Sequence, residues 1–374
     1  MRPAWVEVNL NALKKNLDNL KKCTAAGAEL MTVIKADAYG HGVLKVAETY
    51  RKEGIRRFAV VMLQEGVELR IHGFNEPILI IGNTLIEDFP QLLQYNLTPT
   101  IYKYEQAVEL ERLASQQNIQ FKIHLEVDTG MGRLGFVPGS EAMAAIQKIA
   151  QLAHIEIEGI YTHLATADRL SDQSYVNMQY EKFTGVLNEL ALLNIHIPIK
   201  HMSNSAATIN FPKMHLDMVR PGTSLYGLYP GPEMAASPTI ELFPVLSIKA
   251  KLIHIKPVPV GTRVSYSGTF EAKRASVIGV IPLGYVDGVF RQLANKGCVL
   301  LKGQRCPMVG NICMDQFMID ITDVQNPQIG DEVVILGRQL EECITADEIG
   351  GLVNTISIEV ITRLGKRMPI IYVE

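Results

Sequence analysis

The stretch FKIHLEVD, residues 121–128, decides the fold class because apolar and polar residues alternate along it. The apolar residues are Phe121, Ile123, Leu125 and Val127, and the polar residues are Lys122, His124, Glu126 and Asp128. Such a strand has one apolar and one polar face. In a closed barrel the apolar side chains would meet outer helices, and the polar ones would enter the lumen near the active-site mouth. A half-exposed strand of an open sheet shows the same alternation, so the neighbouring segments must decide.

Similar short runs recur at regular intervals from residue 29 to residue 225, with helical patterns between them. The eight runs are residues 29–37, 57–62, 77–81, 98–102, 120–127, 155–164, 195–201 and 218–225. The helical patterns include residues 104–117, 141–153 and 176–193. Eight parallel strands separated by helices favour an α/β fold in which a (β/α)8 barrel forms the N-terminal domain.

The pattern changes after Pro230, where GPEMAASP (residues 231–238) has the composition of a linker. Short strands with glycine turns follow, including residues 247–255, 276–282, 297–301 and 332–336. We therefore predict a barrel domain over residues 1–235 and a mainly β domain over residues 236–374. The first strand, about residues 3–9, has no partner among the eight barrel runs, so we expect it to pair with the β domain.

The composition favours small-molecule chemistry. The 374 residues carry 36 Lys+Arg and 39 Asp+Glu without a long basic run, which gives no support for nucleic-acid binding. The five cysteines are scattered without paired spacing, so neither disulfides nor a metal site is indicated, and reduced thiols fit the cytoplasm. The N-terminus has no apolar signal region, and no apolar run reaches the roughly 18 residues of a membrane span, so no membrane contact is expected.

Lys35 is the first candidate catalytic residue, in VIKADAYGHG (residues 33–42) at the end of the first barrel strand. Catalytic groups of barrel enzymes lie at this end of the strands. Apolar neighbours would lower the pKa of the amine and allow it to form an imine with a carbonyl compound. A surface lysine at a strand end is the alternative.

A phosphate cradle is predicted in HMSNSAA (residues 201–207) and VRPGTSLYG (residues 219–227), because barrels bind phosphate after strands seven and eight. Ser205 would cap the next helix and also donate to phosphate, and Gly222 would let the backbone approach closely. A plain helix cap is the alternative. An imine-forming lysine and a phosphate cradle in one barrel mouth imply a phosphorylated aldehyde cofactor or a sugar-phosphate substrate.

Eight motifs, in this order and over nearly the whole chain, resemble those of the bacterial alanine racemase family, the pyridoxal-phosphate-dependent alanine/serine racemases. They are VIKADAYGHG, VDTGMGRLGF, THLATAD, HMSNSAA, VRPGTSLYG, SYSGTF, LGYVDGVFR and ICMDQF. The resemblance implies a homodimer that shares its active sites across the interface. It also implies a two-base mechanism, because racemisation removes a proton on one face of a planar carbanion and delivers one on the other.

The resemblance also implies roles for single residues. Lys35 would bind pyridoxal 5'-phosphate and serve as one base, and Tyr266 from the partner subunit would be the other, with His163 as its partner. Arg220 would face the pyridine nitrogen, oriented by His201. The implied cofactor ligands are Lys35, Tyr39, His201, Asn204, Ser205, Arg220, Gly222 and Thr223. The implied substrate-binding residues are Arg133, Met314, Asp315, Tyr285 and Ile358.

Three positions depart from the family pattern. Glu126 occupies the position of a lysine that many members carry in carbamylated form, and it would supply a negative charge directly beside Arg133. Ile358 replaces a tyrosine that donates a hydroxyl to phosphate, which would remove one hydrogen bond and alter the substrate pocket. Asn311 replaces an arginine, which would weaken the positive lining of the entrance.

The resulting hypothesis is an isomerase that interconverts L- and D-alanine and supplies D-amino acid for peptidoglycan. A serine racemase, or a dual alanine/serine racemase domain like those of membrane-attached serine racemases, is the alternative. A non-catalytic pyridoxal-phosphate binding protein would be a single barrel, so Tyr266 and residues 240–374 argue against it. A sugar-phosphate aldolase using Lys35 would not need the β domain.

Overall fold

The computed structural model describes residues 3–374, which divide into two compact units. The barrel unit comprises Lys14–Ala38 and Val43–Phe243. The β unit comprises the described residues up to Leu13, together with Tyr39–Gly42 and Pro244–Glu374. Residues 1 and 2, with which the predicted barrel domain begins, lie outside the described residues.

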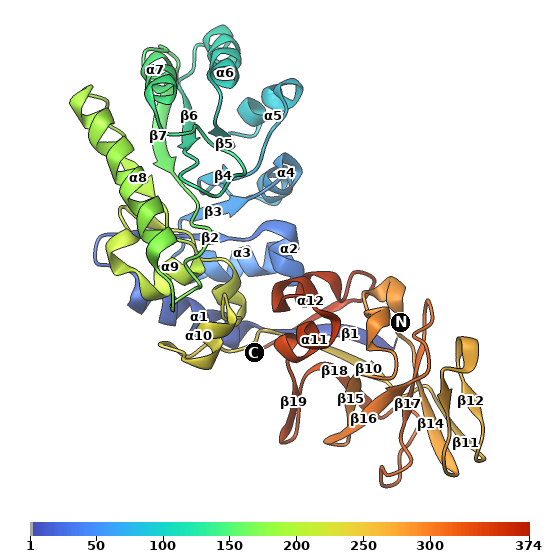
Figure 1. Cartoon of the computed structure of the whole chain (residues 1–374). Coiled ribbons are helices and arrows are strands. Elements are labelled where there is room, and N and C mark those ends of the chain that lie inside the picture. The colour runs from blue at the N-terminus through green and yellow to red at the C-terminus, as the bar shows by residue number, and fades with distance from the viewer. Residues whose placement is uncertain (1–2) are drawn as a thin grey trace. The chain divides into compact units, whose positions relative to one another are not determined.

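The barrel unit contains a closed barrel of parallel strands in the order β2-β3-β4-β5-β6-β7-β8-β9 (Figure 1). The strands are β2 (Glu29–Val33), β3 (Arg57–Val60), β4 (Ile78–Ile80), β5 (Thr98–Ile101), β6 (Phe121–Glu126), β7 (Ile155–Tyr161), β8 (Ile199–His201) and β9 (Met218–Val219). The main helices are α1 (Leu10–Cys23), α3 (Val43–Lys52), α4 (Leu63–Ile71), α5 (Phe89–Gln94), α6 (Tyr104–Gln116), α7 (Ser140–Ile149), α8 (Ser174–Leu192) and α9 (Ser205–Asn210). The predicted (β/α)8 fold is therefore confirmed.

Strand β6 shows how the alternating sequence is used. Its apolar residues Phe121, Ile123 and Leu125 are buried, and so are the polar residues His124 and Glu126. The ring of His124 contacts His201 on β8, and these two strands are separated by β7, so the contact lies inside the barrel. The polar face of β6 thus enters the lumen, and the apolar face packs outward.

The β unit is built on a ten-stranded sheet with the order β11-β14-β17-β16-β15-β18-β10-β1-β20, in which β19 pairs with β18. Its strands are β1 (Ala4–Asn9), β10 (Leu246–Lys251), β11 (His254–Val258), β14 (Ser276–Ile281), β15 (Cys298–Leu301), β16 (Gln304–Val309), β17 (Phe317–Asp320), β18 (Glu332–Gln339), β19 (Glu342–Ile344) and β20 (Ile370–Val373). Val6 of β1 pairs with Ile248 of β10 on one side and with Ile370 of β20 on the other. The N-terminal strand is therefore internal to this sheet.

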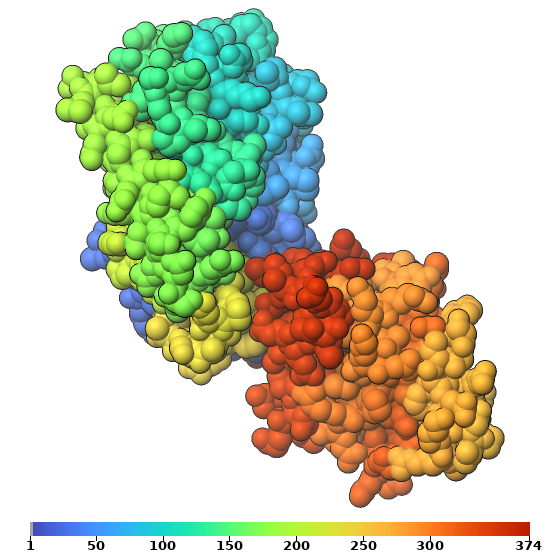
Figure 2. All heavy atoms as spheres, in the orientation of Figure 1, coloured from blue at the N-terminus to red at the C-terminus, as the bar shows by residue number. Residues whose placement is uncertain are grey.

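The β unit also contains two helices that the sequence did not predict, α11 (Ala346–Val353) and α12 (Ser357–Arg363). Thr345 caps α11 by accepting a hydrogen bond from the backbone N–H of Glu348. Figure 2 shows residues 246–374, in orange to red, as one continuous body of packed atoms. Within residues 3–374, no helix combines the length and the apolar character that crossing a bilayer requires.

The division between the units falls at residues 243 and 244, later than the predicted boundary at 235 and 236. Asn16 on α1 explains the difference, because its side chain donates to the carbonyl of Phe243 at 2.8 Å and accepts from the N–H of Phe243 at 2.7 Å. Asn19 donates to the carbonyl of Glu241 at 2.9 Å. The predicted linker also contains a short helix, α10 (Pro232–Ala236). These contacts fasten residues 241–243 to the barrel unit.

Candidate active site

Lys35 opens an unusual helical turn, α2 (Lys35–Gly40), directly after strand β2. Ala36, Asp37, Ala38 and Tyr39 have φ angles of 54°, 53°, 51° and 55°, so the turn is left-handed. Each such residue costs about 1–2 kcal/mol relative to the right-handed form. Side chains compensate: Glu65 accepts from the N–H of Ala36 at 2.6 Å, and Asp37 accepts from the N–H of Val43 at 2.7 Å. A strained turn that is held by its surroundings is typical of a functional site.

The amine of Lys35 has a lowered pKa. Burial is the largest cause, the positive charge of Arg133 adds to it, and Glu65 opposes it. A lower pKa raises the fraction of neutral amine at pH 7, and the neutral amine is the form that attacks a carbonyl carbon. The surroundings of Lys35 therefore favour the neutral amine.

His163 and Arg220 lie in the same electrostatic environment as Lys35. The pKa of His163 is lowered to about 3, first by burial and then by the charges of Arg220, Arg133 and Lys35. The imidazole is therefore neutral at pH 7. The structure thus gathers Lys35, Arg133 and Arg220 beside the neutral His163 at one mouth of the barrel, where the charges of the two arginines favour an anion.

Arg220 is the most firmly held of these side chains. It is buried, its Nη1 donates to His201 Nδ1 at 2.6 Å, and its Nη2 donates to the carbonyl of Thr162 at 2.9 Å. Its guanidinium also lies over the ring of Tyr161, 4.9 Å from the centroid. Burial lowers the pKa of Arg220 to about 10, which leaves the group charged at pH 7. His201 and Tyr161 therefore hold the charged guanidinium of Arg220 in one position.

Glu126 is the buried carboxyl group beside these cations. Its Oε2 accepts from the Tyr161 hydroxyl at 3.2 Å, and its Oε1 lies 3.9 Å from Arg133 Nη2. Burial raises the pKa of Glu126 to about 7, although Arg133 and Tyr161 act in the opposite direction. The carboxyl group thus changes charge close to neutral pH.

The structure corrects one part of the predicted phosphate cradle, the residue that caps helix α9. The cap of helix α9 is Asn204 and not Ser205, because Asn204 Oδ1 accepts from the N–H of Ala207 at 3.1 Å. Ser205 lies one residue too late to cap, and its hydroxyl accepts instead from the N–H groups of Gly222 at 2.9 Å and Ser224 at 3.3 Å. Thr223 is the first residue of the next 3-10 turn, η3 (Thr223–Tyr226). A hydroxyl and backbone N–H groups therefore converge here.

The predicted residues of the β unit lie on neighbouring loops. Tyr266 is 72% exposed at the tip of the hairpin formed by β12 (Arg263–Val264) and β13 (Phe270–Glu271). Its neighbours Ser265 and Ser267 have φ angles of 64° and 63°, and Asn311 Nδ2 donates to the carbonyl of Tyr266 at 2.8 Å. The strained hairpin and the asparagine thus hold the tyrosine outward.

Tyr285, Met314 and Asp315 belong to two further loops that are tied together. The N–H of Tyr285 donates to the carbonyl of Cys313 at 3.1 Å, and the N–H of Val286 donates to that of Met314 at 3.2 Å. Arg367 bridges Asp315 at 2.7 Å and the buried Asp287 at 2.9 Å. The structure therefore braces Asp315, which is itself exposed.

The two remaining residues of the β unit are more buried. Tyr39 is only 7% exposed, and its carbonyl lies 3.0 Å from His41 Nδ1. Ile358 is half-buried on α12, where its carbonyl accepts from the hydroxyl of Thr362 at 2.8 Å.

Comparison with known proteins matches both units. Residues 8–230 match the family model of the alanine racemase N-terminal domain, and residues 245–372 match that of the alanine racemase C-terminal domain. The chain belongs to the alanine racemase family. Members of this family are isomerases, so the resemblance predicted from the motifs is confirmed.

Individual relatives cover the chain from end to end. It is 44% identical to the alanine racemase of Halothermothrix orenii over 98% of this chain and 96% of that protein. The structure of the Bacillus anthracis alanine racemase with bound L-Ala-P has a TM-score of 0.94 and 34% identity, covering 100% of this chain and 96% of that one. The Bartonella henselae alanine racemase with covalently bound pyridoxal phosphate has a TM-score of 0.88 and 29% identity, covering 100% of both chains.

The residues of this racemase barrel suit pyridoxal phosphate, the cofactor of the family. Lys35 offers an amine of lowered pKa to the aldehyde, and the buried cation Arg220 offers N–H donors to a ring nitrogen. The hydroxyl of Ser205, which accepts from Gly222 and Ser224, can still donate its own O–H to phosphate. One raised-pKa carboxyl group, Glu126, faces several cations, and this excess of positive charge calls for an anionic occupant.

Sequence reasoning missed several residues that hold the racemase site. Tyr161 and Thr162 contact Arg220, Glu65 holds the turn after Lys35, and Arg367 braces Asp315. Tyr161 and Thr162 directly precede His163 at the end of a barrel strand, and that position alone could have identified them. Glu65 and Arg367 are far from their partners in sequence and carry no such signal.

We expect Glu126→Gln to change how the folded state responds to pH. The folded pKa of Glu126, about 7, lies above the ordinary value of 4.5, so the folded protein holds a proton there that the unfolded chain releases. The wild type should therefore lose up to about 3 kcal/mol relative to the variant as the pH rises from 4.5 to 7 and above. Urea unfolding of both proteins at pH 5 and pH 8 measures this difference. Glu156→Gln, at a more exposed carboxylate, is the control, and a pH-independent difference for Glu126→Gln would contradict the prediction.

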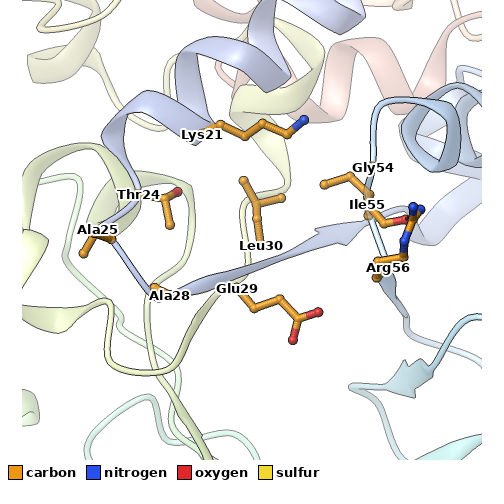
Figure 3. Close-up of a pocket in the computed structure, with 10 residues that line it drawn as sticks. Lys21, Thr24, Ala25, Ala28, Glu29, Leu30, Gly54, Ile55 and Arg56 are labelled. Atoms are coloured by element: carbon orange, nitrogen blue, oxygen red, sulfur yellow. Dashed lines mark hydrogen bonds between the residues drawn. The ribbon is translucent and has the colours of Figure 1, made fainter.

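A separate pocket of about 490 Å³ lies at the opposite end of β2 from Lys35. Figure 3 shows Glu29 at the start of that strand and Gly54, Ile55 and Arg56 in the loop before β3. Lys21 donates to the carbonyl of Glu53 at 2.6 Å, and Glu29 pairs with Arg57 at 2.8 Å. Catalytic groups of barrels lie at the other end of the strands, so this pocket is not the candidate site.

Proposed function

We propose that this chain is a racemase that interconverts L- and D-alanine with pyridoxal 5'-phosphate bound to Lys35. The observation that carries the proposal is the lysine of lowered pKa at the barrel mouth, together with Arg133, His163 and Arg220, in a chain that matches both family domains. The relatives named above act on alanine or bind its analogue and this cofactor according to their descriptions, which supports the same assignment here.

Lys35 and Tyr266 would carry out the two transfers of the substrate's Cα proton. When bound, pyridoxal phosphate withdraws electrons from the substrate's Cα and so acidifies its C–H bond. The Nζ of Lys35 would remove or return the Cα proton on one face, and the Tyr266 hydroxyl would do so on the other. His163 would assist Tyr266, because a neutral imidazole can accept the phenol's hydrogen bond at pH 7.

The remaining residues would bind and orient. Arg220 would donate a hydrogen bond to the ring nitrogen without giving up its proton, which limits how strongly electrons are withdrawn. Arg133 would bind the substrate carboxylate with charge-assisted hydrogen bonds, and Glu126 would hold Arg133. The backbone of Met314 would assist at the carboxylate, Asp315 would brace the site through Arg367, and Tyr285 would line the entrance from the partner subunit.

We further propose that the enzyme works as a homodimer in which Tyr266 and Tyr285 serve the partner's barrel. Tyr266, Tyr285 and Met314 are 72%, 40% and 53% exposed in the single chain, which supports an interface over these loops. The enzyme would act in the cytoplasm, where its five cysteines would stay reduced, and would supply D-amino acid for peptidoglycan.

A paired assay tests the proposed function. Purified protein is given L-alanine or L-serine, and formation of the D-enantiomer is measured, while the visible absorbance of the protein reports bound pyridoxal phosphate. We expect the cofactor band and a higher kcat/KM for alanine. A cofactor band without racemisation would indicate a binding protein, and turnover of serine alone would reassign the substrate.

Ile358→Tyr tests whether Ile358 sets the substrate range. The added hydroxyl should donate one charge-assisted hydrogen bond to phosphate, about 1.5–3 kcal/mol, and therefore tighten cofactor binding. The phenol should also crowd the substrate's β-carbon and lower the serine-to-alanine ratio of kcat/KM. Ile356→Tyr, at a position that is 65% exposed on the same segment, is the control. An unchanged or higher ratio would show that Ile358 does not control substrate size.

A further inference from the structure

A continuous chain of hydrogen bonds crosses the barrel lumen from Glu158 on β7 to Arg220 after β9. Glu158 Oε2 lies 3.1 Å from His124 Nε2, and His124 Nδ1 lies 2.8 Å from His201 Nε2. His201 Nδ1 lies 2.6 Å from Arg220 Nη1. All four residues are buried. We call this set the lumen relay, and Glu158 and His124 have no role in the proposed function so far.

The chemistry of arginine fixes the direction of every bond in the lumen relay. A guanidinium only donates, so His201 Nδ1 accepts, and its proton must lie on Nε2. His201 Nε2 therefore donates to His124 Nδ1, which places the proton of His124 on Nε2. That N–H donates to Glu158, which only accepts when ionised. Both histidines are neutral Nε2–H tautomers in this arrangement.

Local geometry is adapted to the lumen relay. Strand β6 has a register shift between Ile123 and His124, and His124 pairs there with Gly159 of β7. A Cβ atom on Gly159 would lie 2.4 Å from the ring of His124, so only glycine leaves room for the imidazole. The ring of His201 stacks on Tyr161 with centroids 4.8 Å apart and planes inclined by 19°. Both rings are therefore held in place.

The negative charge of Glu158, at the end of the lumen relay away from Arg220, is stabilised by two cationic side chains. Glu158 receives hydrogen bonds from Lys122 at 2.9 Å and from Arg57 at 3.1 Å. Burial acts to raise its pKa, but the hydrogen bonds from His124 and Lys122 and the charge of Arg57 lower it overall, so Glu158 stays ionised. Burial lowers the pKa of both His124 and His201, which agrees with neutral rings. A pocket of about 230 Å³ adjoins Glu158 and Lys122.

We propose that Glu158 and His124 are positioning residues that act through His201 to hold the guanidinium of Arg220 toward the racemase site. This inference rests on the proposed function for the role of Arg220. An ionised acceptor at the end of the relay satisfies the N–H of His124 and polarises the bonds beyond it. Without that acceptor the buried Nε2–H of His124 is left without a hydrogen bond. The imidazole rings of His124 and His201 are then no longer held in one orientation.

The first test reads the tautomers without any cofactor or substrate. Protein labelled with 15N-histidine is compared with His124→Phe and His201→Asn, which assign the two signals. We expect both rings to be neutral and protonated on Nε2 at pH 7. A charged ring, or a proton on Nδ1 of His201, would overturn the lumen relay. Racemisation plays no part in this readout, so it decides the relay even if the wild type proves inactive, an outcome that would instead overturn the proposed function.

The second test separates the hydrogen bond from the charge. Glu158→Leu should lower kcat about ten- to a hundred-fold, the size of the loss seen when the outer partner of a metal-bound histidine is removed, with KM changed less than about threefold. Glu158→Gln keeps an acceptor oxygen and should recover most of this loss. Glu156→Gln, which affects only the more exposed carboxylate beside Lys122, should leave kcat unchanged.

A further variant guards against unfolding of Glu158→Leu. His124→Phe fills the ring's volume and leaves Glu158 paired with Lys122 and Arg57, so the fold should persist while the relay is broken. It should lower kcat by the same ten- to a hundred-fold. Unchanged kcat in folded His124→Phe, or equal losses in Glu158→Leu and Glu158→Gln, would overturn the positioning role.

Discussion

Replacing Lys35 with alanine is expected to abolish racemisation and to remove the visible absorbance of covalently held pyridoxal phosphate. The proposed function requires this amine twice, once to bind the cofactor and once to move the Cα proton. The loss should not come from unfolding, because burial and Arg133 outweigh Glu65 and lower the pKa of the amine, so its charge is on balance unfavourable in the folded protein. The midpoint of urea unfolding of the cofactor-free proteins should therefore be nearly unchanged.

Lys45→Ala is the matched control for Lys35→Ala. Lys45 lies ten positions further along the chain, on helix α3, and forms an exposed ion pair with Glu48 at 3.1 Å. Exposed pairs contribute at most about 1 kcal/mol, so this variant should keep both the absorbance band and the activity. An active Lys35→Ala protein with a normal cofactor band would remove Lys35 from the mechanism.

The fold was predictable where a local sequence pattern is compatible with only one kind of structure. The alternation in β6 and the eight regular runs identified the barrel, since a closed sheet with helices outside is the arrangement that buries both faces of such strands. Helices α11 and α12 were missed because they are short and follow a series of strands. The two compact units divide after Phe243, beyond the predicted linker, and a linker composition cannot reveal that Asn16 holds Phe243.

The candidate site was predictable from motifs, but its supports were not. The left-handed turn after Lys35 contradicts the local preference of Ala36 and Ala38, and only contacts such as that from Glu65 make it possible. The lumen relay depends on a register shift and on the missing side chain of Gly159, which no local pattern shows. Ser205 and Asn204 are both good helix caps, so the sequence could not decide between them.

Tyr266→Phe should reduce racemisation by about 10² to 10⁴, the usual contribution of a positioned acid or base. The phenylalanine keeps the ring at the tip of the hairpin, where Val264 and Phe270 still pack in the cluster that anchors it, so only the hydroxyl is lost. Cofactor binding should remain because Lys35 is intact. Solvent exchange of the Cα proton should slow more for L-alanine than for D-alanine, because each base serves one face. Tyr104→Phe, at a half-buried tyrosine on α6, is the control.

Mixing the two inactive variants decides whether Tyr266 acts across a dimer. A heterodimer of Lys35→Ala and Tyr266→Phe chains would hold one site with both changes and one site with neither, because each site takes its lysine and its tyrosine from different chains. Random exchange of subunits makes half of the dimers mixed, so activity should return to about a quarter of the wild-type value. If Tyr266 served the barrel of its own chain, every site in the mixture would carry one of the two changes and no activity would return. Equal slowing of L- and D-alanine exchange, with cofactor still bound, would contradict the assignment of Tyr266 to one face.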